Sequence, residues 1–161
     1  MNFKVIFLLA LAAILSSCSS SGPLYSEALT INIENKGQIV IFRQDKFKAG
    51  GACFQTVLDK ERKGYLANAG FVRFDVVPGN HKIIVGADGE EQLINVEAGK
   101  KYFFEFSAHF NITSLHIVSP TFVKAASETE SKLVEVSESY ALKFLPKLKD
   151  SSVKYKCMTK L

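Results

Sequence analysis

The sequence predicts a mainly β protein: a single antiparallel β-sandwich of about seven or eight strands with a short C-terminal helix. Three observations favour this fold. Apolar segments rich in β-branched and aromatic residues recur every ~8–12 residues, and turn residues separate them. Within the segments apolar and polar side chains alternate, most clearly in "VRFDV" at residues 72–76. No internal repeat or second domain is evident.

The predicted strands follow one another along the chain with turns between them. Pro78-Gly79-Asn80, Asp88-Gly89 and Gly99 mark the turns of the most regular part. The candidate strand segments are residues 28–35, 38–44, 51–59, 71–77, 81–87, 91–98 and 101–107.

The last of these strands, "YFFEF", is apolar on both faces, so it predicts a cover on each side. Tyr102, Phe104 and Phe106 share the face that belongs to the sandwich core. Phe103 lies on the other face, beside Glu105, and needs a separate cover.

A short C-terminal helix is the predicted cover for Phe103. Ser137 is a natural N-cap, so the helix should begin at about Glu138. Pro146 disfavours helix at Leu145, so the helix should end or kink there. The residues that form one apolar stripe at helical spacing are Tyr140, Ala141, Phe144, Leu145 and Leu148.

The chain begins with a predicted export leader. Val5 to Leu15 is an unbroken apolar run of 11 residues, too short to span a bilayer, which needs ~20. It fits the apolar region of a signal peptide. The tetrapeptide that ends at Cys18 resembles the lipobox of bacterial lipoproteins, which implies cleavage between Ser17 and Cys18 and a diacylglycerol and fatty acyl (palmitate) groups on Cys18. An ordinary secreted protein is the alternative.

This interpretation divides the chain into a signal peptide (1–17), a lipidated tether (18–28) and a β-sandwich domain with its helix and tail (29–161). Acyl chains on Cys18 make a membrane the first predicted partner. The absence of Asp after Cys18 resembles the outer-membrane sorting pattern. The expected location is therefore the bacterial cell envelope, on the outer membrane facing the periplasm if the host has two membranes.

Charge argues against a nucleic-acid partner. The formal net charge is +4, and removal of the leader, which carries one Lys and no acid, leaves +3. The lysines are scattered except in the C-terminal tail, whereas nucleic-acid binders concentrate them on one face. The tail has two open interpretations, contact with anionic lipid or simple solvation.

Two cysteines remain once Cys18 is assigned to lipid. In an oxidising compartment two such thiols usually pair, so we expect a Cys53–Cys157 disulfide. The alternative is one buried and one free thiol.

Residues 37–106 resemble a family of small bacterial lipoproteins with a domain of unknown function. The shared marks are the strand Ile39–Arg43, Gly64, the turn Pro78–His81 and the segment Val96–Phe103. Similar turns and strands occur in PEGA-type modules and other prealbumin-like sandwiches. The resemblance implies a β-sandwich and an envelope lipoprotein, and it implies no known activity.

Motifs for catalysis are absent from the sequence, so we predict no catalytic residues, no metal and no cofactor. The spacing of His81, His109 and His116 matches no zinc pattern. There is no G-x-S-x-G elbow. Four glutamates near the C-terminus read as a solvated face, and two aromatics beside the "ANAG" turn are candidates for exposure. These residues are Glu128, Glu130, Glu135 and Glu138, and Tyr65 and Phe71.

The predicted function is that of a lipid-anchored, non-enzymatic binding or structural module whose partner is another envelope protein. The alternative is a small enzyme that acts on envelope polymer through scattered Asp, Glu and His side chains. A deep pocket with convergent polar groups favours the enzyme. An open sheet edge or apolar patch favours the binding module.

Overall fold

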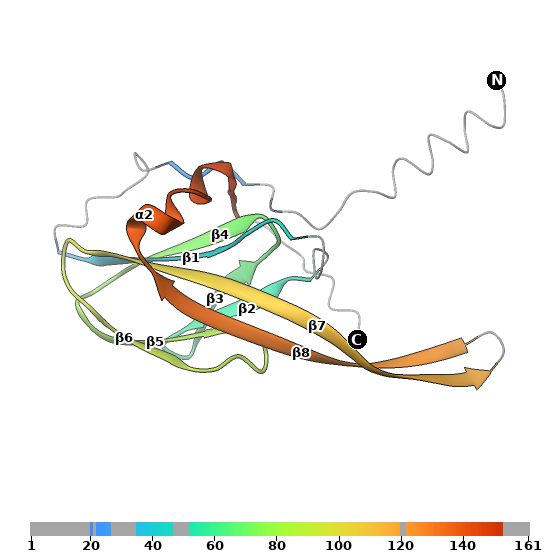
Figure 1. The fold of residues 1–161 in the computed structure, drawn as a ribbon. Coiled ribbons are helices and arrows are strands. Elements are labelled where there is room, and N and C mark those ends of the chain that lie inside the picture. The colour runs from blue at the N-terminus through green and yellow to red at the C-terminus, as the bar shows by residue number, and fades with distance from the viewer. Residues whose placement is uncertain (1–19, 21, 27–34, 47–51, 120–121, 153–161) are drawn as a thin grey trace, which may run out of the picture.

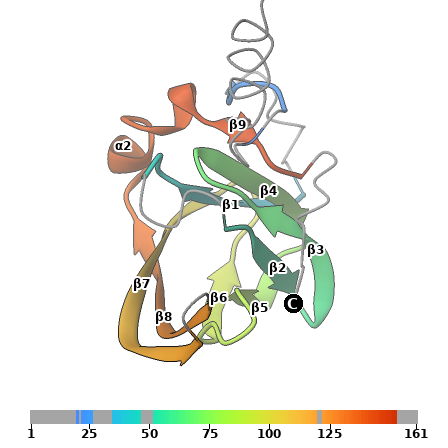
Figure 2. The same ribbon diagram turned by 90° about the vertical axis from the view of Figure 1, so that its right-hand side faces the viewer.

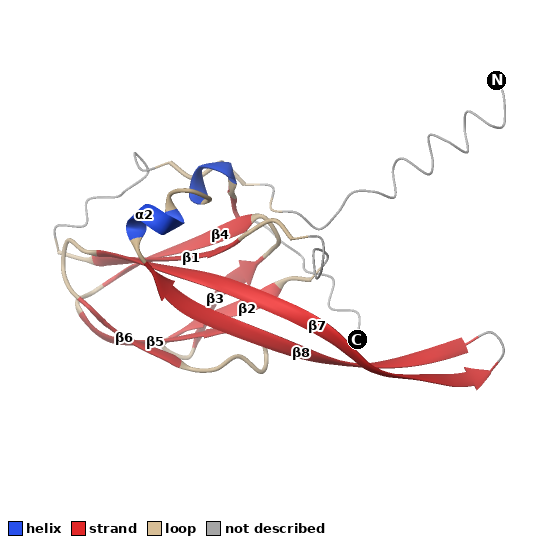
Figure 3. Ribbon diagram, in the orientation of Figure 1, coloured by secondary structure: helices blue, strands red, loops and turns tan. Residues whose placement is uncertain are grey.

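The computed structural model describes residues 20, 22–26, 35–46, 52–119 and 122–152, with side chains for all of these except 110–129. Two β-sheets lie face to face, and the helical turns lie together above one of them (Figure 1, Figure 3). The strands are β1 (Gly37–Arg43), β2 (Phe54–Leu58), β3 (Glu61–Leu66), β4 (Gly70–Val76), β5 (Gly79–Val85), β6 (Gln92–Val96), β7 (Lys101–Ser119), β8 (Phe122–Val136) and β9 (Lys149–Asp150).

The predicted β-sandwich is confirmed, with nine strands in the described part of the chain instead of seven or eight. One sheet has the order β8-β7-β1-β4-β9 and the other β3-β2-β5-β6. The first sheet is not wholly antiparallel, because β1 pairs in parallel with β7 and β4 with β9. Three of the nine, β3, β8 and β9, are not among the predicted segments. The predicted strand at 28–35 lies, except for Asn35, outside the described residues.

The main core fills the space between the two sheets. It takes one face of each strand, including Ile39 and Ile41 of β1 and Phe104 and Phe106 of β7, all at most 2% exposed. The rings of Phe106 and Phe54 lie 4.7 Å apart across the two sheets. The face of "YFFEF" assigned to the sandwich core is therefore confirmed.

The outer face of the five-stranded sheet carries a second core under a cap. We call α2 (Glu138–Ala141), the 3₁₀ turn η2 (Leu145–Lys147) and β9 the cap. The apolar side chains that meet there, all buried, are Tyr25, Val40, Phe42, Phe71, Phe103, Ala141, Leu145 and Leu148. The predicted cover over Phe103 is thus confirmed, and this double coverage explains why all seven residues of β1 are buried.

The start of the cap helix agrees with the sequence, whereas its end at Ala141 comes four residues before the predicted end at about Leu145. The Ser137 hydroxyl accepts a hydrogen bond from the Tyr140 backbone N–H at 3.3 Å, as an N-cap should. The helix ends before Pro146, and η2 carries Leu145 back onto the sheet. No helix among the described residues is long and apolar enough to cross a membrane.

Both ends of the described chain meet beside the first residue of β4. The Ser20 and Ser151 hydroxyls lie 2.6 Å apart, and Ser20 N–H donates to the Asn68 carbonyl at 3.3 Å. Tyr25 packs edge-on against Phe71 with 5.3 Å between ring centroids. Part of the predicted tether therefore packs on the domain beside β9, where Leu24 forms an isolated β-bridge with Lys149 (Figure 2).

The β7–β8 hairpin continues far beyond the sandwich. β1 pairs with β7 only as far as Glu105, whereas β8 accompanies β7 to Ser119. We call residues 109–130, past the last side chain that enters the main core, the arm. At ~3.4 Å per residue its strands extend about 35 Å, and the arm stands clear of the body in Figure 1.

Candidate functional site

A tight turn between β2 and β3 places Asp59 against the neighbouring strand. Asp59 and Lys60 both have positive φ, 51° and 72°, as a two-residue hairpin turn with right-handed strand twist requires. Asp tolerates this conformation better than most residues. The Asp59 backbone N–H donates to the Lys82 carbonyl at 3.0 Å, so the turn is fixed to β5.

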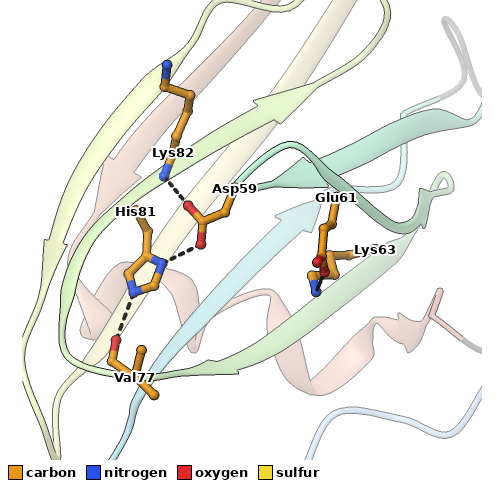
Figure 4. A network of polar contacts seen from close by, with 6 residues as sticks. All are labelled: Asp59, Glu61, Lys63, Val77, His81 and Lys82. Atoms are coloured by element: carbon orange, nitrogen blue, oxygen red, sulfur yellow. Dashed lines mark hydrogen bonds and ion pairs between the residues drawn. The ribbon is translucent and has the colours of Figure 1, made fainter.

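A buried histidine joins this turn to the β4–β5 connection (Figure 4). One Asp59 carboxylate oxygen accepts from His81 Nδ1 at 2.6 Å, and the other accepts from the Lys82 backbone N–H at 3.0 Å. His81 Nε2 donates to the Val77 carbonyl at 2.7 Å. The His81 side chain is 9% exposed and that of Asp59 46%.

Both nitrogens of His81 face acceptor oxygens, so the imidazolium is the form that satisfies both contacts. Burial by itself lowers the pKa of His81, but the hydrogen bonds that His81 donates to Asp59 and Val77 outweigh it and raise that pKa above 6.5. Burial also opposes the Asp59 charge, yet the bonds from His81 and Lys82 prevail and lower the pKa of Asp59. We call the Asp59–His81 ion pair the latch, because it joins the β2–β3 hairpin to the β5–β6 hairpin.

A shallow depression of ≈ 530 Å³ lies over this latch. Its rim carries charges of both signs, among them Glu61, Lys63, Arg73 and Asp75. The lining contains no hydroxyl or thiol, so it offers no serine, threonine or cysteine nucleophile. His81 has no lone pair free to accept a proton, because both its nitrogens are engaged. In the part of the chain with described side chains, no three His, Cys, Asp or Glu residues are placed to hold a metal ion.

A second polar cluster joins the cap to the base of the arm. Glu105 of β7 accepts a hydrogen bond from Gln44 at 2.7 Å and another from the Tyr140 hydroxyl at 3.0 Å. The bond to Glu105 raises the pKa of Tyr140. With His109 and Lys46 these residues border a depression of ≈ 330 Å³. One carboxylate oxygen therefore holds α2 on the sheet through Tyr140, and the other accepts from Gln44, the residue after β1.

The arm presents unpaired backbone along both of its edges. β8 is the outermost strand of its sheet, and beyond Glu105 β7 has no neighbour on its other side among the described strands. Its N–H and C=O groups are therefore available to another strand. Residues 110–126 contain a single charged residue, Lys124, so the sequence lacks the charges that usually protect an open edge.

The cysteines predicted to carry lipid and a disulfide are only partly described. Cys53 precedes β2 and is half-buried. Ser17, Cys18 and Cys157 lie outside the described residues. Lipidation of Cys18 and the pairing of Cys53 with Cys157 therefore stay predictions.

Other residues singled out in the sequence are placed apart from one another. His109 is exposed at the base of the arm and borders a different depression from His81, and the side chain of His116 is not described. Phe71 is 1% exposed, so its predicted exposure is wrong, because Tyr25 covers it. Tyr65 is half-buried. The glutamates with described side chains, Glu130, Glu135 and Glu138, are exposed, as a solvated face requires.

Sequence reasoning missed the Asp59–His81 latch and the arm. The sequence does contain a signal for the latch. In "VPGNH" His81 follows Val77 by four residues, so its side chain can hydrogen-bond to the Val77 carbonyl across the intervening turn, and Asp59 occupies a two-residue turn. The signal for the arm is the long low-charge stretch from 110 to 126.

Comparison with known proteins identifies a family without an assigned activity. The model of the family described as "Protein of unknown function (DUF2846)" matches residues 33–120. The match runs from just before β1 to the end of β7, so it includes one strand of the arm. No curated protein and no solved structure matches the chain.

Proposed function

The chain belongs to the DUF2846 family of proteins of unknown function, and we propose that it is a lipid-anchored, non-enzymatic envelope module that binds another envelope protein through its β7–β8 arm. We also propose that its β-sandwich is of the PEGA-like type. The anchor is the acylated Cys18, and the partner supplies an extended strand to an edge of the arm.

The arm is the observation that carries the proposal. A two-stranded ribbon is marginally stable by itself in water, and β1 gives β7 no support beyond Glu105. The two arm residues with described side chains, His109 and Glu130, are exposed and belong to neither core, so the described cores do not rest on them. A partner strand would pair the free backbone groups and bury the low-charge stretch, which accounts for its length and composition.

The two polar clusters support a binding role over the enzymatic alternative. His81, the most buried histidine described, is fully hydrogen-bonded, and Glu105 is used in the same way. Each serves to join elements of the fold. The depression over the latch contains no hydroxyl or thiol. The other is lined by Ser107 and His109, and among the described contacts no hydrogen bond joins the two, as a base that activates a serine requires.

The anchor is tested by Cys18→Ser. The substitution should abolish incorporation of a fatty-acid analogue and leave an unprocessed or soluble chain, because the acylated thiol is the proposed attachment point. Detergent partition and label incorporation measure this. Label retained by the variant would contradict the anchor.

The arm is tested by replacing residues 109–130 with Asn-Gly, which joins Ala108 to its register partner Ser131 by a two-residue turn. Wild type and variant, both lipidated, are cross-linked in native membranes and captured. Proteins recovered with wild type should be lost with the variant, while the melting temperature of the sandwich stays within about 3 °C, since little core is removed. Identical cross-linked partners would contradict the role of the arm.

A further inference from the structure

The strand position beside the far half of β7 is left open by the chain that fills it along the near half. β1 occupies that position, and its pairing with β7 ends at Glu105. After β1 the chain turns toward the opposite side of β1. The backbone N–H of Lys46 donates to the Asn68 side chain at 3.2 Å, and the Asn68 amide donates to Asp45 at 2.7 Å. Asn68 lies in the connection that leads into β4, the neighbour of β1 on the side away from β7. From Phe106 onward this edge of β7 therefore has no partner among the described strands.

The two edges of the arm differ in charge. None of the residues 106–119 on β7 is Asp, Glu, Lys or Arg. Charged side chains, lysines above all, keep an edge strand from pairing with other strands. β8, the outermost strand, carries five of them among its fifteen residues, namely Lys124, Glu128, Glu130, Lys132 and Glu135. The β7 edge is thus the one that is open to a further strand, and the β8 edge is the protected one.

A second copy of the chain suits the β7 edge because each copy satisfies the other. Two identical edges pair antiparallel about a twofold axis, which is a closed arrangement. Two arms of two strands each then form one ribbon in the order β8-β7-β7-β8, and both outer strands of that ribbon are the charged β8. A single strand from an unrelated protein would bring a second edge that needs protection of its own. The ribbon also has the strand number that a sheet needs for stability in water, which one hairpin lacks.

An irregularity in β7 also favours a second copy. The β7–β8 register shifts between Ile112 and Ser114, where β7 contains one more residue than β8. If residues 108–117 of the two copies overlap, Ala108 of one lies opposite Ile117 of the other, and the twofold axis passes between residues 112 and 113. The bulge then falls at the same point in both strands, so neither is displaced relative to the other. A regular strand would lose its register with β7 at that point.

We propose that the arm binds a second copy of this chain, with the two β7 strands paired antiparallel over residues 108–117. This inference rests on the proposed function and names the partner of the β7 edge. In this register His109 of one copy is opposite His116 of the other. The arm stands clear of the body (Figure 1), and the antiparallel arrangement places the two bodies at opposite ends of the ribbon. The described cores are therefore unchanged by the pairing.

Cysteines at positions 109 and 116 test the pairing in native membranes. Opposite residues of an antiparallel pair have Cα atoms about 4.5–5.5 Å apart, close enough for a disulfide. Within one chain the two positions are about 24 Å apart along the strand, and so are like positions of the two copies. Copper-phenanthroline oxidation of the lipidated His109→Cys/His116→Cys protein should therefore give a covalent dimer on a non-reducing gel. His109→Cys and His116→Cys, each made separately as matched controls, should stay monomeric.

Sedimentation equilibrium of the soluble Cys18→Ser chain measures the association without cross-linking or anchor. The chain with its arm should sediment as a dimer at micromolar concentration. Replacement of residues 109–130 by Asn-Gly in the same chain should give a monomer, so that the measured mass falls by about half.

The opposing results separate this inference from the proposed function. Single-cysteine variants that cross-link as fast as the double variant would overturn the antiparallel register. A chain that is monomeric in both assays, while other envelope proteins are still captured through the arm, would overturn the second copy and leave the proposed function standing. A monomer that also captures nothing through the arm would overturn both.

Discussion

Replacing Leu145 with Ala tests whether the cap is an integral part of the fold. Leu145 is fully buried in the second core, where the cap covers Phe103 and Phe42. The substitution removes three carbon atoms, each with a transfer free energy of ~0.8 kcal/mol, and leaves a cavity beneath η2. Buried Leu→Ala substitutions lower the free energy of unfolding by about 2–5 kcal/mol.

We expect a loss of about 3 kcal/mol in the free energy of unfolding. For a domain of this size that corresponds to a fall in melting temperature of about 10 °C. Thermal and urea unfolding followed by circular dichroism measure both quantities on the Cys18→Ser chain. Leu93→Ala is the matched control: Leu93 on β6 is 67% exposed, so its truncation should change stability by less than ~0.5 kcal/mol.

The comparison has a clear opposing result. If Leu145→Ala and Leu93→Ala unfold at the same temperature and the same urea concentration, then the cap does not stabilise the sheet. The second core would then be no part of the cooperative unit, and Phe103 would be covered in another way.

Three further predictions address the latch and the chain ends. Because the pKa of His81 is raised in the folded state, the stabilising contribution of His81 is complete below about pH 6.5 and is lost as the pH rises through the higher folded value. The urea midpoint of the wild type should therefore fall over this pH range, and that of His81→Gln should fall less. Parallel pH profiles for the two proteins would refute the latch. Asp59→Asn should remove the same pH dependence, since its carboxylate favours the imidazolium. A Cβ at Gly70 would overlap the Ser20 and Ser151 hydroxyls. Gly70→Ala should therefore lower the free energy of unfolding by about 1–3 kcal/mol and speed proteolysis of the N-terminal segment. Unchanged cleavage rates would show that the chain ends are not held at Gly70. The Cys53–Cys157 pairing predicts no alkylation of either thiol in native, unreduced protein by intact mass, and two added alkyl groups would exclude it.

The sequence determined the features that depend on local periodicity and capping. Alternation along "VRFDV" and the apolar faces of "YFFEF" specified which side chains enter the sandwich and which need a second cover. Ser137 set the start of the cap helix, whereas Pro146 lies in the 3₁₀ turn η2 that follows it. These could be predicted because side-chain direction alternates along any strand, and because a cap residue acts on the backbone of its own turn.

Only the tertiary structure decided which distant segments meet. Ser20 and Ser151, and likewise Asp59 and His81, come together from separate parts of the chain. The parallel pairing of β1 with β7 leaves the far half of β7 with β8 alone, and so creates the arm. Strand order and register follow from how two sheets pack their faces together, which the alternation within one strand does not specify.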